Sequence, residues 1–136
     1  MSAEQLFEKL EDKNQNIQYA INKIFAGEYQ ILPDSIAYGK VLKIHYKGDL
    51  NSQEGFELGF LILTPNSGIK KHKHINDIEK YQVIYGTLSI EGINSLENVC
   101  LIEEEHCIDK VTQLTIIKTI KINKKLLNEK QKTLSI

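Results

Sequence analysis

Residues 65–91 of this chain read PNSGIKKHKHINDIEKYQVIYGTLSIE, and this stretch decides the fold. His72 and His74 stand two apart, and because alternate side chains of an extended strand point to the same face, both imidazoles can reach one point in space. Glu79 follows after a short predicted loop and opens a second strand that ends at Tyr85. Two histidines on one strand beside a carboxylate on the next predict a group of donors suited to Fe, Mn, Ni, Co or Zn.

The same stretch resembles the first motif of the cupin superfamily, which can be written G-x5-H-x-H-x(3,4)-E-x6-G. Asn66 stands in the place of the first glycine, and asparagine is the next best residue for a tight turn. The spacings from there to His72, His74, Glu79 and Gly86 all fit the motif.

The second cupin motif, P-x-G-x2-H-x3-N, is matched only at its histidine, His106. Leu101, Glu103 and Lys110 stand where proline, glycine and asparagine would be. The resemblance covers about residues 36–122 and implies a divalent metal ion (Fe, Mn, Ni or Zn) and a homodimer paired through outer strands. A cupin barrel that has lost its metal is the alternative. The ligands that the resemblance implies are His72, His74, Glu79 and His106.

Residues 1–27 are predicted to be helical. Apolar residues follow the spacing of an amphipathic helix, and Gly27 is a plausible stop after them. These apolar residues are Ile17, Ala20, Ile21, Ile24 and Phe25. The helix either packs against the outside of a barrel or serves as a dimer contact or lid.

Period-two alternation of apolar residues predicts strands over most of the remaining chain. Around residues 36–47 it places Ile44 inward and His45 between two lysines on a solvent face, so that His45 is not expected to be a ligand. Residues 56–62 and 112–122 are predicted to turn Phe56, Leu58, Phe60 and Ile62, and Leu114, Ile116, Ile120 and Ile122, to the interior. Residues 92–98 are expected to form a loop.

The pattern of many short strands after a helical start predicts a mainly β protein, an antiparallel double-sheet barrel of the jelly-roll kind. With 136 residues the chain is expected to form one domain. Its expected parts are an N-terminal helical segment (1–30), a cupin barrel (31–122) and a C-terminal tail (123–136).

The composition limits the classes of partner that the protein is expected to bind. A formal net charge of -1 gives no bulk attraction to nucleic acid or to an anionic membrane. No targeting segment or apolar run of membrane-spanning length is recognised, so a cytoplasmic protein with a small-molecule ligand is expected. The chain contains no arginine, so any anionic substrate must be held by lysine, metal, backbone N–H groups or hydroxyls.

An open metal site allows both isomerisation and oxygenation. The run from Glu79 to Thr87 is similar to the equivalent run in cupin sugar-phosphate isomerases, which favours a sugar-type isomerase. An iron-dependent oxygenase and a non-catalytic ligand-binding cupin are the alternatives. Lys118 falls among inward-facing apolar residues, so it is either paired inside or turned outward by a bulge near residues 116–117. If inward, it is a candidate base, and Tyr81 and Tyr85 are candidates to relay a proton or to hold a hydroxyl.

Overall fold

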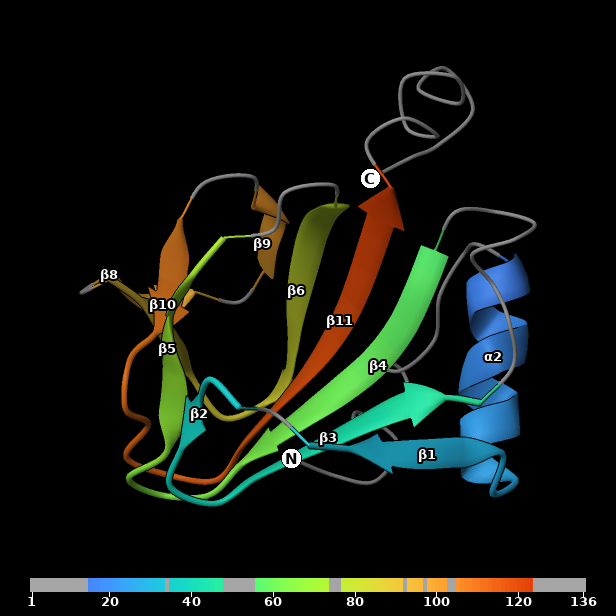
Figure 1. Cartoon of the computed structure of the whole chain (residues 1–136), viewed down its shortest axis with the longest axis horizontal. Helices are drawn as coiled ribbons and strands as arrows, with labels where there is room; N and C mark the ends of the chain where they lie inside the picture. Colours follow the sequence, from blue (N-terminus) through green and yellow to red (C-terminus); the bar gives the residue numbers. More distant parts are fainter. Residues whose placement is uncertain are drawn as a thin grey trace.

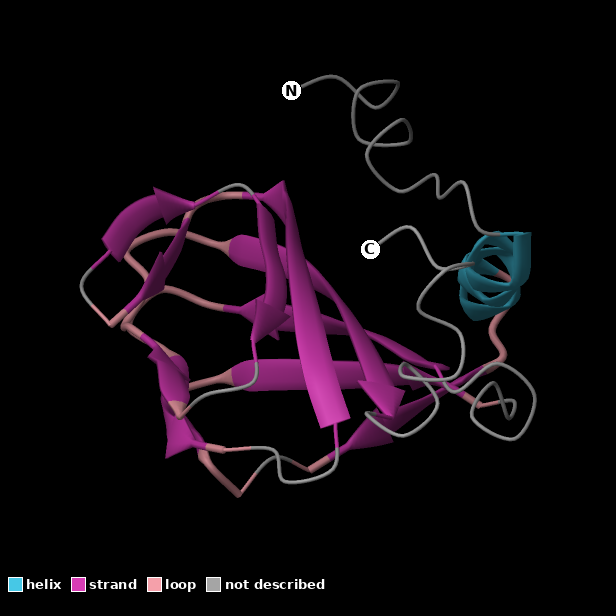
Figure 2. Ribbon diagram, turned by 90° about the horizontal axis from the view of Figure 1, so that it is seen from above, coloured by secondary structure: helices cyan, strands magenta, loops and turns pink. Residues whose placement is uncertain are grey.

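The computed structural model of the protein describes residues 15–33, 35–47, 56–73, 77–91, 93–96, 98–102 and 105–123. This part of the chain is mainly β, with its antiparallel strands arranged in two sheets that face each other (Figures 1 and 2). A helix lies against the outer side of the larger sheet, at the right of Figure 1. The arrangement therefore has three layers, with the helix and the smaller sheet on opposite faces of the larger sheet.

The larger sheet has the strand order β1-β3-β4-β11-β6-β9. Its strands are β1 (Tyr29–Leu32), β3 (Val41–Tyr46), β4 (Phe56–Leu63), β11 (Thr115–Asn123), β6 (Asp77–Tyr85) and β9 (Asn98–Ile102). The smaller sheet has the order β2-β5-β10-β7-β8. Its strands are β2 (Ala37–Tyr38), β5 (Gly68–His72), β10 (His106–Ile108), β7 (Leu88–Ile90) and β8 (Ile93–Leu96). Strand β8 corrects the expectation of a loop over residues 92–98, because Ile93 and Leu96 pair with β7.

The turns of the first motif adopt the backbone conformations that its glycines require. Asn66, in the place of the first glycine, has a φ of 71°. Asparagine tolerates this left-handed region better than most residues do, so the replacement keeps the turn. Gly86 has a φ of 87°, and a Cβ there would lie 2.5 Å from the carbonyl oxygen of Leu114. The turn between β6 and β7 therefore needs glycine.

Helix α2 (Gln15–Phe25) forms where the amphipathic spacing predicts it. Its apolar stripe of Ile17, Ala20, Ile21 and Ile24 is buried against the larger sheet. Gly27, with a φ of 98°, follows the helix as its stop. For the described residues, the helix is thus a layer packed on the outside of the barrel.

The apolar residues of the larger sheet form two cores, one on each face. Leu58, Phe60 and Ile120 face the helix, whereas Leu61, Val83 and Ile117 face the smaller sheet. The predictions that turned Leu58, Phe60 and Ile120 to the barrel interior are therefore wrong. The alternation was correct, but both faces of the sheet are covered, so alternation alone does not tell which face is the interior.

Strand β6 carries a bulge where it pairs with β11. Ile117 pairs with Val83 but Ile116 pairs with Tyr85, so Ile84 is the extra residue. This confirms the irregularity expected near residues 116–117. Within the described part of the chain, no helix is long and apolar enough to span a membrane.

Candidate metal centre and pocket

Two histidines face each other across neighbouring strands of the smaller sheet. His72 ends β5, and His106 begins β10 directly opposite it in the antiparallel register. Their ring centroids are 4.4 Å apart, and His106 is only 3% exposed. Directly opposite residues of an antiparallel pair bring their side chains together, so the pairing of β5 with β10 places both imidazoles on one side of the sheet.

Glu79 reaches the two histidines from the opposite sheet. It lies near the start of β6, is 5% exposed, and its Oε1 is 3.8 Å from Nε2 of His106. One ligand atom from each of Glu79, His72 and His106 can be chosen so that all three lie within 4.8 Å of one another. The facing of the two sheets thus brings together three of the four predicted ligands. His74 lies outside the described residues, so its part in the site stays a prediction.

The hydroxyl of Tyr81 lies in the same group of polar atoms. Tyr81 is two residues after Glu79 on β6, and its side chain is fully buried. The hydroxyl donates a hydrogen bond to Oε1 of Glu79 at 2.5 Å and lies 3.1 Å from Nε2 of His106. Tyr81 therefore orients the carboxylate from within the site, while the Nδ1 of His72 is held by the carbonyl oxygen of Lys70 at 2.8 Å. When Nδ1–H donates to that oxygen, Nε2 is the nitrogen that carries the lone pair.

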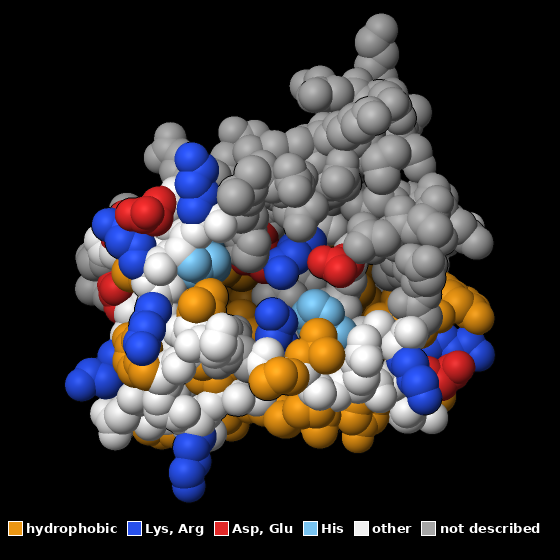
Figure 3. Space-filling model, in the orientation of Figure 1, with side chains coloured by type: hydrophobic (Ala, Val, Ile, Leu, Met, Phe, Trp, Pro, Cys, Tyr) orange, Lys and Arg blue, Asp and Glu red, His pale blue; other side chains and the backbone are white. Residues whose placement is uncertain are grey.

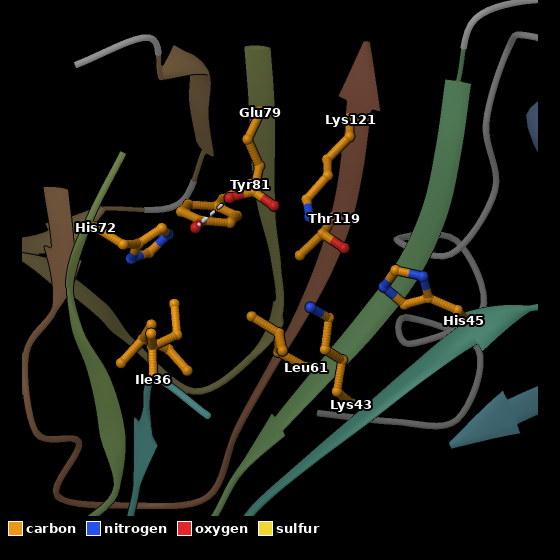
Figure 4. Close-up of a pocket in the computed structure, with 10 residues that line it drawn as sticks. Ile36, Lys43, His45, Leu61, His72, Glu79, Tyr81, Thr119 and Lys121 are labelled. Carbon is orange, nitrogen blue, oxygen red and sulfur yellow. Dashed lines mark hydrogen bonds between the residues drawn. The ribbon is translucent and has the colours of Figure 1, made fainter. Parts of the chain in front are cut away.

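Two of the metal-ligand candidates, His72 and Glu79, line a small pocket with a cavity volume of about 40 Å³. Figure 4 shows His72, Glu79 and Tyr81 on one side, and Lys43, His45, Thr119 and Lys121 on the other. On the surface, lysine, histidine and acidic side chains gather around this hollow (Figure 3). The remaining lining residues are Ile36, Leu61 and Ile69.

His45 lines this pocket, so the prediction that it faces solvent is wrong. It pairs with Gly59 in the register of β3 and β4, and a Cβ at Gly59 would lie 2.7 Å from the His45 ring. The missing side chain of Gly59 thus makes the space that His45 occupies. A glycine in the middle of a strand often marks such a close approach, but only the strand register identifies His45 as the residue that approaches Gly59.

Two lysines lie near His45 in the pocket. The pKa of His45 is lowered to about 4, first by burial and then by the charges of Lys43 and Lys121, while Glu79 acts in the opposite direction. At neutral pH the imidazole is therefore uncharged. Sequence reasoning missed Lys43, Thr119 and Lys121 as pocket residues because the inward face of their strands was assigned wrongly.

Lys118 lies on the face of β11 that is turned away from the pocket. It pairs with Phe60, which faces the helix, and it is 1% exposed. Neither alternative holds as stated, because Lys118 faces away from the pocket and yet is buried rather than exposed to solvent. Ile116, Lys118 and Ile120 share the face of β11 that packs towards the helix, and the bulge lies on β6.

Tyr85 is also away from the pocket. Beyond the bulge it pairs with Ile116, a residue of the outward row, and it is 42% exposed. The prediction that Tyr85 shares the face of Glu79 is wrong, because the extra residue in β6 reverses the face to which the following side chain points. Of the three residues predicted to act on a proton, only Tyr81 lines the pocket.

The comparisons with known proteins find the fold but no close relative. No protein-family model matches the sequence, and no curated protein does. Among solved structures, a predicted oxalate decarboxylase from Thermotoga maritima matches with a TM-score of 0.56 at 17% identity, over 70% of this chain and 91% of that one. A cupin-like protein from the same organism matches with a TM-score of 0.57 at 13% identity, over 71% and 79% of the two chains.

A Cupin 2 conserved barrel domain protein from Salinispora arenicola matches with a TM-score of 0.50 at 12% identity, over 77% of this chain and 98% of that one. The fold is that of a cupin. At such low identity the likeness establishes the fold alone, and what this chain does must be argued from its own residues.

The donors in this cupin barrel fit a divalent metal ion. Metal–ligand bonds to imidazole and carboxylate are about 2.0–2.2 Å long, so two ligands on one ion lie at most roughly 4.4 Å apart. The His72, Glu79 and His106 atoms lie close to this limit, and two of the three side chains are deeply buried. Two imidazoles and a carboxylate suit Fe, Mn, Ni or Zn, and the structure does not distinguish among these metals.

Proposed function

We propose that the protein is a metal-dependent cupin enzyme that acts on a small polar metabolite, with sugar-type isomerisation as the favoured reaction. The observation that carries this proposal is the grouping of His72, Glu79 and His106, two of which, His72 and Glu79, line a pocket that also holds groups able to bind or move protons. A purely structural metal site would have no use for the ionisable groups opposite it.

The ion would be held by His72, Glu79 and His106, with His74 as a further ligand. When bound, such an ion polarises a carbonyl or hydroxyl oxygen of the substrate. Glu79 would reduce the charge of the site, and the hydrogen bond from Tyr81 would keep its carboxylate in place.

Isomerisation of a hydroxy-carbonyl compound moves one proton between neighbouring carbons and a second from the hydroxyl oxygen to the carbonyl oxygen, and it involves no net oxidation. Lys118 is on the other face of the sheet, so it no longer serves as the base in this proposal. His45 is the remaining candidate for that role, because it lines the pocket and its imidazole is uncharged at neutral pH, but a pKa lowered to about 4 makes it a weak base. Tyr81 could hold a substrate hydroxyl from the wall opposite His45.

Exchange of substrate hydrogen with solvent tests this proposal directly. Protein reloaded in turn with Fe, Mn, Ni and Zn would be incubated in D₂O with a panel of small α-hydroxy aldehydes and ketones, and deuterium at carbon would be followed by NMR. We expect metal-dependent incorporation that is lost in His106→Ala and kept in Tyr85→Phe, whose side chain lies outside the pocket. Oxygen uptake without exchange would move the function to the iron-dependent oxygenase. Ligand binding with neither reaction would make the protein a non-catalytic binding cupin.

A further inference from the structure

Two lysines on the larger sheet point into the pocket, with Lys121 on the strand next to Glu79 and both lysines across the pocket from His72. Lys43 comes from β3 and Lys121 from β11, and Figure 4 shows both side chains directed into the cavity with Thr119 near them. Both lysines are half-buried. Lysine stems are commonly buried, but the ammonium group normally stays in water or has a partner.

Neither ammonium group is neutralised within the described part of the chain. Lys121 stands opposite Glu57 and Glu79 in the strand register, yet no ion pair of Lys43 or Lys121 is formed among the described residues. Among the residues that line the pocket, two ammonium groups thus accompany one carboxylate, that of Glu79, while Glu57 flanks Lys121 from β4. A divalent ion on the histidine side would increase this excess of positive charge.

The surroundings of the lysines suit a small anion. The Thr119 hydroxyl can donate a hydrogen bond to such an anion, and the uncharged His45 ring adds a polar nitrogen to the same wall. Lys43 and Lys121 both lower the pKa of His45, although burial lowers it more, so both ammonium groups act on this wall. Because the cavity is small, one short charged group is what it can admit.

We infer that Lys43 and Lys121 form a carboxylate subsite, so that the substrate is a small acid whose carboxylate lies on the lysine wall and whose carbonyl or hydroxyl faces the histidines. Only one part of this inference rests on the proposed function, namely that the carbonyl or hydroxyl of the substrate faces the histidines. A carboxylate is favoured over the bulkier phosphate because the cavity, with a volume of about 40 Å³, is small.

Binding of malonate, a short dicarboxylate, tests the subsite. Calorimetric titrations would compare malonate, neutral malonamide and inorganic phosphate, each with metal-free and metal-loaded protein. We expect metal-free protein to bind malonate but not malonamide, and Lys43→Gln and Lys121→Gln each to weaken malonate binding by about tenfold. Lys40→Gln is the matched control, since Lys40 is exposed beside the same strand and outside the pocket.

The outcomes separate this inference from the proposed function. If malonate binding is the same with and without metal but is lost in both lysine variants, the subsite stands and the metal centre fails. If metal loads normally while both lysine variants bind malonate as the parent protein does, the subsite is overturned. Phosphate binding tighter than malonate binding, with the same dependence on both lysines, would overturn the assignment to a carboxylate.

Discussion

Tyr81 shows how one side chain can link two of the predicted ligands. Its hydroxyl contacts both Glu79 and His106 in a place that water cannot freely reach. In a low-dielectric site, a hydrogen bond to a carboxylate is strong, and losing it leaves the carboxylate less well oriented. The fixed hydroxyl therefore suggests that metal affinity depends on a residue that need not touch the ion.

Replacement of Tyr81 by phenylalanine tests this dependence. We expect Tyr81→Phe to weaken Zn²⁺ or Ni²⁺ binding by roughly 10-fold or more, the usual effect of losing a hydrogen bond to a metal ligand. The measurement is a calorimetric titration at constant pH, with circular dichroism to check the fold. Tyr85→Phe removes the same hydroxyl at an exposed position outside the pocket and should leave affinity unchanged. Equal affinity in Tyr81→Phe and the parent protein would show that this hydroxyl does not support the site.

A second prediction concerns how His45 affects the dependence of stability on pH. Its pKa is about 4 in the folded protein, below the ordinary value of 6.5 that applies to the unfolded chain. As pH falls from about 6.5 to about 4, the unfolded chain takes up this proton before the folded protein does, so protonation favours unfolding. The contribution of His45 to stability is therefore present above pH 6.5 and lost as pH falls towards 4.

We expect the parent protein to lose more stability between pH 7 and pH 5 than His45→Gln does. Urea unfolding at the two pH values measures the loss in each protein, and the carboxylates that titrate in the same range are common to both. A loss of equal size in the two proteins would mean that the lowered pKa of His45 is not a property of the folded state in solution.

The strands of the larger sheet show what can and cannot be predicted from the sequence at the scale of elements. The positions of the strands, the helix and the turns follow from periodicity and from residues such as Asn66 and Gly27, whose conformations are local. Which face of a strand lies inside is not local. The pattern around His45 and Lys118 has the right period, but the helix covers one apolar face and the smaller sheet the other.

The candidate site was predictable in part for the same reason. His72, Glu79 and His106 were found by spacing and resemblance, which do not depend on the choice of face. The opposite wall of the pocket follows only from cross-strand register, which sets His45 beside Gly59 and Thr119 beside Tyr81. Register is set by pairing between distant segments, so a single sequence does not reveal it.

Substitution of Gly59 on β4 tests this register. A Cβ at position 59 would lie 2.7 Å from Cδ2 of His45 and 2.8 Å from the carbonyl oxygen of Ile44. The ring can move but the backbone oxygen cannot easily do so, and overpacking of this kind costs about 1–3 kcal/mol. We expect Gly59→Ala to reduce the free energy of unfolding by that amount.

The double variant Gly59→Ala/His45→Ala separates the two contacts. It should recover part of the loss in urea unfolding, because the ring contact is removed and only the contact with the Ile44 oxygen remains. No loss of stability in Gly59→Ala would contradict the register of β3 and β4 on which the pocket depends.

At the scale of the whole molecule, the edge of the larger sheet is the feature that bears on assembly. Strand β1 ends the sheet, and two of its apolar side chains are exposed, Tyr29 by 42% and Ile31 by 59%. An edge strand with exposed apolar residues can pair with another chain unless something protects it. The homodimer implied by the cupin resemblance stays a prediction, and β1 is the outer strand through which we expect it to form.

Sedimentation velocity at micromolar concentration measures this association. We expect the parent protein to sediment as a dimer and Ile31→Lys to shift it towards monomer, because a charge at the edge strand disfavours pairing. Leu114→Lys is the control, since Leu114 is 41% exposed in the connection between β10 and β11, away from β1. It should leave the dimer intact. A parent protein that sediments only as monomer would contradict the homodimer, and a dimer unaffected by Ile31→Lys would place the interface elsewhere than β1.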